Sequence, residues 1–502
     1  MAILVITIIS LPLLAAAVLA LYALALIPLR ALPAGEYAQA VRAPLWLAVL
    51  VSGGMAGLAL VALLRAAPVA EPAFVGWART GPVLLMDAYT LWAGALLGAV
   101  LAAAAWVPAA RRSLGARAGG PAIVLLLALW CALLLLAGLR LPLLMLAWLA
   151  LLVGVGLLWL RLGRPLRGWA DWGPLAALGL AALLALGGLG WLHGQLGPML
   201  ITEAWSSILT AAPRAASGAM LLVMLGWLGP AVYLPWWLWR RRDEPAQAWL
   251  PAALLVTVVG PLALARLACF LFPRLDVAAL AAPGIGDLFL VRQLLIWLQA
   301  WGWLALLLGG GWLVAAAWRR RRILDAMQPL PLAASGLLLL GLAMGLRAQS
   351  PAGVASMLWL ILAWAGTLTI ALTAGSLLDA LTPGERTERW VLAASIWVGV
   401  AMLVGLPPGP VYRAVAAGWE SFAAVGAPRP LLLLALAVIA LCAGWLLPRW
   451  LRARYATAPR PGAGWGILAP VALALLLLAA GCLAAHLQPI HELIRRSLLQ
   501  AY

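Results

Sequence analysis

The sequence contains no lysine and few charged residues of any kind. Charged residues make up 10% of its 502 positions, and all 33 lysine-or-arginine positions are arginines. A soluble domain carries about 25% charged residues. The composition therefore excludes a soluble enzyme.

Cysteine and histidine are also scarce, and their positions carry no metal or disulfide pattern. The four cysteines stand singly in apolar segments, at Cys131, Cys269, Cys442 and Cys482. No CxxC or Cys/His spacing is present, and the chain has no Walker loop, catalytic triad or haem motif. We therefore predict no catalytic residue, metal or cofactor. We expect no chemistry of its own.

The chain is instead rich in long apolar runs, because hydrophobic residues fill 66% of it. A bilayer core needs about 20 apolar residues per spanning helix. The runs are continuous and rich in Leu and Ala rather than alternating, so helices are favoured over a barrel. Fourteen runs fall at 3–29, 44–64, 86–107, 121–139, 141–160, 172–192, 217–239, 248–270, 289–317, 329–346, 353–378, 390–411, 428–448 and 464–485. We predict an all-α polytopic membrane protein with about fourteen transmembrane helices.

The net charge of +18 indicates membrane topology rather than nucleic-acid binding. Basic patches interleaved with aromatic residues are absent, so we predict no nucleic-acid partner. Most arginines, including Arg240 to Arg242 and Arg319 to Arg322, fall in loops that alternate to one side of the predicted helices. Because basic loops stay in the cytoplasm, we expect a bacterial-type inner membrane, lipid contacts and both termini on the outer side.

Two of the predicted helices contain glycine and proline in related places. The seventh run contains Gly229 and Pro230, and the twelfth contains Gly405, Pro407 and Pro408. Proline removes a helix donor, and paired interruptions are typical of inverted repeats. We predict broken helices seven and twelve within two inverted five-helix repeats, helices 4–8 and 9–13. The alternative is that these prolines have no such meaning, because proline is common in membrane helices.

The repeats divide the chain into four parts. Residues 1–119 hold helices one to three, and residues 120–272 hold the first repeat. Residues 273–450 hold the second repeat, and residues 451–502 hold helix fourteen with a short tail.

Short motifs, in order along the chain, resemble those of a known family. They are Asp87-Ala88-Tyr89-Thr90-Leu91, Trp148, Pro235-Trp236-Trp237-Leu238-Trp239, Gly260 with Arg266, Ala374-Gly375-Ser376, and Gly405-Leu406-Pro407-Pro408. With fourteen helices and two repeats, they resemble the antiporter-like subunits of respiratory complex I and the Mrp cation antiporters. Related subunits occur in membrane-bound hydrogenases and DAB inorganic-carbon complexes. The resemblance implies other membrane subunits as partners.

The resemblance also implies ion-path residues that this chain lacks. The family carries a glutamate on helix five and lysines on helices seven, eight and eleven; the matching positions here are Leu149, Pro230, Val258 and Thr367. A family histidine corresponds to Trp237. Arginine cannot replace such lysines, because it does not deprotonate in proteins.

Helix twelve keeps two charged residues near its proline-rich segment. Arg413 lies close to the family's lysine position, and Glu420 follows seven residues later on the same helical face. The pair is either a residual ion site or an interfacial pair with Arg413 extended toward water.

Three functions follow as hypotheses. The leading one is an antiporter-like subunit of a multi-subunit ion-translocating, redox or inorganic-carbon complex whose own proton path is largely lost, leaving a scaffold or docking role. The second is an active proton or cation translocator that uses Arg413 and Glu420 with partner residues. The third is an unrelated small-molecule transporter that binds its substrate near Pro230 or Pro407.

Overall fold

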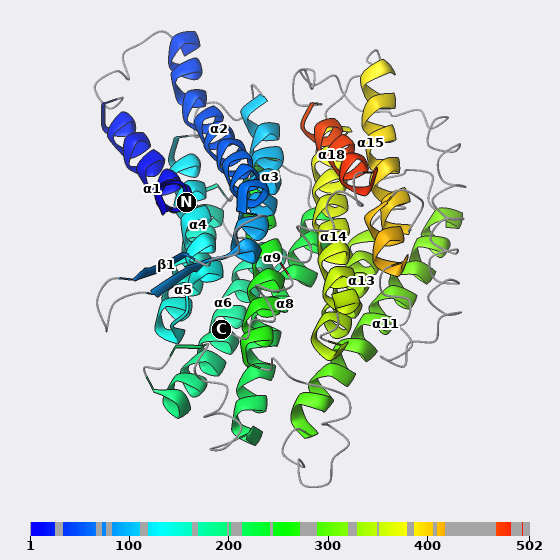
Figure 1. The fold of residues 1–502 in the computed structure, drawn as a ribbon. Coiled ribbons are helices and arrows are strands. Elements are labelled where there is room, and N and C mark those ends of the chain that lie inside the picture. Colours follow the sequence, from blue (N-terminus) through cyan, green and yellow to red (C-terminus); the bar gives the residue numbers. More distant parts are fainter. Residues whose placement is uncertain are drawn as a thin grey trace. The chain divides into compact units, whose positions relative to one another are not determined.

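The computed structural model gives the fold as a bundle of long helices (Figure 1). It describes residues 2–25, 34–66, 73–76, 83–110, 119–162, 169–197, 200–201, 213–240, 244–271, 289–319, 329–348, 351–378, 386–404, 409–416, 468–482 and 494. The predicted run at 428–448 lies outside these residues.

The described helices follow the other apolar runs one for one. They are α1 (Ala2–Ala25), α2 (Ala34–Ala66), α3 (Ala88–Ala110), α4 (Gly119–Ala137), α5 (Leu141–Leu162), α6 (Trp169–Leu196), α8 (Pro213–Arg240), α9 (Glu244–Leu271), α11 (Phe289–Arg319), α13 (Leu330–Ala348), α14 (Pro351–Leu378), α15 (Arg386–Val404) and α18 (Leu468–Cys482). Within the described ranges, 8 of them are long and apolar enough to cross a membrane. The prediction of a polytopic helical membrane protein is confirmed.

The chain divides into two compact units. The first comprises Met1–Ile201, Leu222–Leu264 and Ala463–Ala469, so it holds α1 to α6 with most of α8 and α9. The second comprises Thr202–Leu221, Ala265–Gly462 and Pro470–Tyr502. The four-part division and the inverted relation of the repeats remain predictions.

Neighbouring helices pack in a similar order within the two units. In the first unit α4 packs against α5 and α5 against α6; α1 and α2 lie against each other and against α4. In the second unit α11 packs against α13, α13 against α14, and α14 against α15. These are the helices that the predicted repeats pair with one another, α4 with α11, α5 with α13 and α6 with α14.

A small β-hairpin precedes α3, in a segment where no strand was predicted. Strand β1 (Ala73–Gly76) pairs antiparallel with β2 (Val83–Met86), with Phe74 opposite Leu85. Leu84 also bridges to Gly138, in the tight connection between α4 and α5. The backbone N–H of Ile201 donates to the carbonyl of Leu139 at 2.9 Å. The hairpin thus satisfies backbone groups at the turn that joins the two helices.

The two predicted helix breaks differ. Helix α8 runs without interruption from Pro213 to Arg240 with Pro230 inside it, so the prediction of a broken seventh helix is corrected. A proline within a helix removes one N–H, and packed neighbours hold the remaining turns in place. The twelfth run is interrupted, because α15 ends at Val404, Gly409 is a bend, and residues 410–416 are again helical. Gly405, Pro407 and Pro408 lie outside the described residues.

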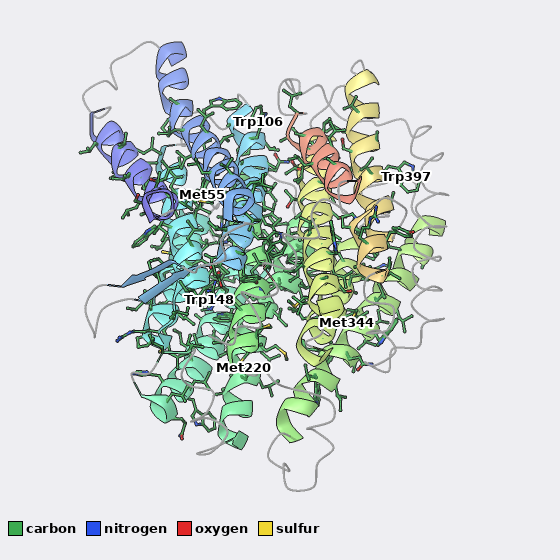
Figure 2. The ribbon with its side chains drawn as sticks, in the orientation of Figure 1. Met55, Trp106, Trp148, Met220, Met344 and Trp397 are labelled. Atoms are coloured by element: carbon green, nitrogen blue, oxygen red, sulfur yellow. The ribbon has the colours of Figure 1, made fainter. Side chains whose placement is uncertain are left out.

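Helix α9 lies in the first unit as far as Leu264. Its whole apolar stretch, Gln247–Cys269, is buried. The hydroxyl of Tyr89 on α3 donates to the carbonyl of Leu262 at 2.6 Å, and the indole of Trp249 donates to the carbonyl of Val155 on α5 at 2.9 Å. Figure 2 draws the dense side-chain packing around the helices of this unit.

Glycines allow several helix backbones to approach closely. A side-chain carbon added at Gly260 on α9 would strike the carbonyl of Trp227 on α8. One at Gly226 would meet the backbone of Ala185 on α6, and one at Gly309 on α11 would meet the backbone of Ala333 on α13. Small residues serve this purpose in membrane proteins because apolar burial does not drive helices together in lipid.

We predict that Gly309→Leu separates α11 from α13, whereas Gly311→Leu does not. Gly309 is buried against Ala333, but Gly311 is exposed and has no atom within 4 Å of an added side-chain carbon. Overpacking such a contact costs about 1–3 kcal/mol, so the melting temperature of purified Gly309→Leu should fall clearly. Equal melting temperatures for the two variants would contradict the close α11–α13 contact.

Candidate functional site

The position that corresponds to the family's helix-five glutamate faces away from the core of the first unit. Leu149 on α5 is 37% exposed, whereas its neighbour Trp148 is fully buried. The buried stripe of α5 includes Leu144, Trp148 and Leu151, and Leu149 is outside it. A carboxylate at Leu149 would therefore point away from α9 rather than toward it.

The two positions of the first unit that the resemblance aligns with family lysines lie inside apolar packing. Pro230 on α8 is buried, and Val258 on α9 has no exposed surface. Both sit within one turn of the contact between Trp227 and Gly260. Gly229, next to Pro230, is exposed with open space beside it. Neither interior position offers a group that titrates.

A cluster of three tryptophans includes Trp237, the position that the resemblance aligns with a family histidine. The ring centroid of Trp237 lies 4.8 Å from that of Trp159 and 5.7 Å from that of Trp249. Trp159 and Trp249 are 5.1 Å apart. Edge-to-face packing of this kind adds to the stability that burial of the rings provides. The aromatic cluster therefore fills this region with packed rings.

A second aromatic pair lies deeper in the first unit. Trp148 on α5 and Trp227 on α8 have ring centroids 6.1 Å apart at an interplanar angle of 65°. Both side chains are fully buried. Together with the cluster around Trp237, they link α5, α8 and α9.

In the second unit, Thr367, which the resemblance aligns with a family lysine, makes a structural contact. It is buried on α14, and its hydroxyl donates to the carbonyl of Gly399 on α15 at 3.0 Å. Ser356, on the same helix, donates to the carbonyl of Ala414 at 2.8 Å. Helix α14 is thus bonded to the chain before and after the interruption at Gly409.

The other buried hydroxyls of α14 bond to their own helix. Thr369 donates to the carbonyl of Ala365 at 2.7 Å, and Thr373 donates to that of Thr369 at 2.6 Å. Ser376 donates to the carbonyl of Thr373 at 2.7 Å. These bonds satisfy the hydroxyls locally.

Arg413 is half-buried in the helical segment that follows the interruption. Its backbone N–H donates to the carbonyl of Gly409 at 3.1 Å. Its guanidinium carbon lies 5.9 Å from the ring centroid of Tyr412, which is 41% exposed. Glu420 lies outside the described residues, so the proposed Arg413–Glu420 pair stays a prediction.

Asp87 is a buried carboxylate with a clear structural role. It is 5% exposed and precedes α3, where its Oδ1 accepts the backbone N–H of Thr90 at 2.9 Å and the Thr90 hydroxyl at 2.7 Å. This is an N-cap, which satisfies donors at the start of the helix. Among the residues that the structure describes, no group of three or more His, Cys, Asp or Glu residues is placed to hold a metal ion.

The packing of these inward-facing tryptophans against one another was not predicted from the sequence. A signal was present on α5. Trp148 and Trp159 are eleven residues apart, close to three helical turns, so they share one face. That face is the buried stripe of the helix.

Comparison with known proteins gives likenesses of fold. No protein-family model matches the chain, and no curated protein matches it. The chain resembles a solved chain of the membrane-bound sulfane sulfur reductase (MBS), an archaeal respiratory membrane complex, with a TM-score of 0.69 and 18% identity over 98% of this chain and 97% of that one.

Two further solved structures are similar over nearly the whole chain. A chain of the Mrp complex from Dietzia sp. DQ12-45-1b has a TM-score of 0.67 and 15% identity, covering 98% of each chain. A chain of respiratory complex I from Thermus thermophilus has a TM-score of 0.63 and 19% identity, covering 99% of this chain and all 100% of that one. The chain is therefore a multi-pass helical membrane protein with the fold of the antiporter-like subunits that the sequence motifs resemble.

Proposed function

We propose that the chain is an antiporter-like subunit of a multi-subunit membrane complex, and that its own proton path has been largely lost. Its role in that complex is to dock and support partner subunits. The observation that carries the proposal is the buried stretch Gln247–Cys269 of α9, which has Val258 at the position aligned with a family lysine and Arg266 as its one charged residue.

Moving a proton through hydrocarbon requires ionisable groups inside a hydrated protein interior. The polar groups of α9 are few, and the hydroxyl of Thr257 donates to the carbonyl of Ala253 at 2.7 Å. The Trp159–Trp237–Trp249 cluster fills the region where the family carries a histidine. These contacts support a packed interior in place of a proton relay.

The second unit supports the same conclusion at a different position. Thr367 stands where the family has a lysine, and its hydroxyl is used to join α14 to α15. A hydroxyl does not carry a charge at neutral pH, so it cannot exchange a proton with a partner carboxylate as a lysine does.

Several helices present apolar faces that suit other membrane helices as well as lipid. On α5, Leu146 is 66% exposed, Val153 49% and Leu157 59%. The similar chains belong to an archaeal respiratory membrane complex, an Mrp complex and respiratory complex I. The exposed apolar faces and these similarities both support the proposal that the chain binds partner subunits.

The docking role predicts a stable partner. We expect the chain, extracted from its native membrane in a mild detergent, to elute with one or more membrane subunits in fixed ratio, as identified by mass spectrometry. The exposed apolar faces would be covered in that assembly. Elution as a single monodisperse species that transports ions without any partner would sink the proposal.

Flux measurements separate the docking role from active translocation. If the chain has no ion path, Arg413→Gln and Glu420→Gln in the reconstituted complex should each change proton or sodium flux by less than about twofold. Assembly of the complex, checked by its elution volume, serves as the control. A loss of about tenfold or more, with assembly intact, would favour a translocator that uses these two residues.

Thr367 should behave as a structural residue. Thr367→Val removes the bond to Gly399 at nearly constant volume and should lower the unfolding free energy by about 0.6–1 kcal/mol. The matched control is Thr369→Val, which removes only a bond within α14 and should have a smaller effect on the melting temperature. Flux lost in Thr367→Val without loss of stability would contradict the structural role.

A further inference from the structure

Two indole N–H groups inside the first unit have no acceptor among the residues that the structure describes. They belong to Trp148 and Trp227, whose side chains are fully buried. The chain provides a direct contrast in Trp249, which is also fully buried and donates to the carbonyl of Val155 at 2.9 Å. Buried polar groups are nearly always hydrogen-bonded, so the two unpaired donors indicate a bound acceptor.

Backbone carbonyls that lack a helical donor lie at the same level of the unit. Pro230 has no N–H, which leaves the carbonyl of Gly226 without its usual partner on α8. Pro261 does the same for the carbonyl of Thr257 on α9. Gly260, beside Pro261, lies against the carbonyl of Trp227, so these turns of α8 and α9 are in direct contact.

We propose that this level of the first unit binds water at a fixed site. The ligands are the N–H groups of Trp148 and Trp227 and the carbonyl oxygens of Gly226 and Thr257. A buried water needs two to four polar partners, and the two rings are neighbours, with centroids 6.1 Å apart.

The mixture of donors and acceptors selects the chemical class of the ligand. A cation would meet two N–H donors, and an anion would meet two carbonyl oxygens. A small neutral molecule that both donates and accepts hydrogen bonds satisfies all four groups, and water is the one that fits a packed interior. The site lies beside Pro230 and Val258, the lost lysine positions, and it does not depend on whether the chain translocates ions.

The test uses the full-length protein in lipid bilayers with ¹⁵N-labelled indoles and water-edited solid-state NMR. The signals of Trp148, Trp227 and Trp249 are assigned by their loss in the three single Trp→Phe variants. We expect magnetisation from water to reach the N–H groups of Trp148 and Trp227 several-fold faster than that of Trp249. Equal transfer to all three would show that the site is dry and would overturn the proposal.

Proline variants test the acceptors without removing any ring. Pro261→Ala restores an N–H opposite the carbonyl of Thr257 and should slow water transfer to Trp227. Pro251→Ala, in the same helix, restores an N–H opposite the carbonyl of Gln247 and should leave the signal unchanged. Alanine favours helix, so both variants should fold. No change in Pro261→Ala would remove the carbonyl of Thr257 from the site and overturn the four-group arrangement.

Discussion

The close approach of helix backbones at glycine is the contact on which each unit depends. Gly260 lies against the carbonyl of Trp227, so α9 and α8 approach closely there, and α9 is buried along Gln247–Cys269. Gly309 and Gly336 bring α11 and α13 together in the second unit in the same way. Lipid tails are as apolar as leucine, so packing of this closeness replaces the hydrophobic effect between helices. The long Leu- and Ala-rich stretches pack around these contacts.

Element positions were predictable because lipid leaves an apolar run little choice but to form a helix. Contacts were harder to predict, since the sequence does not indicate which glycine faces a neighbour. Gly309 and Gly311 are two residues apart, yet only Gly309 lies against another helix. The hairpin that bridges Leu84 to Gly138 was missed because it is four residues long on each side and lies between apolar runs. The predicted break at Pro230 failed because a proline can be held inside a helix by its neighbours.

What could be predicted of the candidate site was mainly that ionisable side chains are absent from the positions aligned with family lysines. Without lysine, the apolar or hydroxyl character of Pro230, Val258 and Thr367 was evident from the letters alone. What fills those places depends on tertiary packing. The ring cluster at Trp237 and the bond from Thr367 to Gly399 join segments that are distant in sequence, and no local pattern predicts such pairs. The outward direction of Leu149 follows from the buried stripe of α5.

The two hydroxyl bonds of α14 have a mechanical consequence. Ser356 and Thr367 are eleven residues apart on one helix face. Their hydroxyls donate hydrogen bonds to the chain on opposite sides of the bend at Gly409. An interrupted helix normally acts as a hinge, because its two halves can turn independently. Here α14 is hydrogen-bonded to both halves, which restricts their independent rotation about the bend. The two bonds thereby stiffen the second unit across the bend.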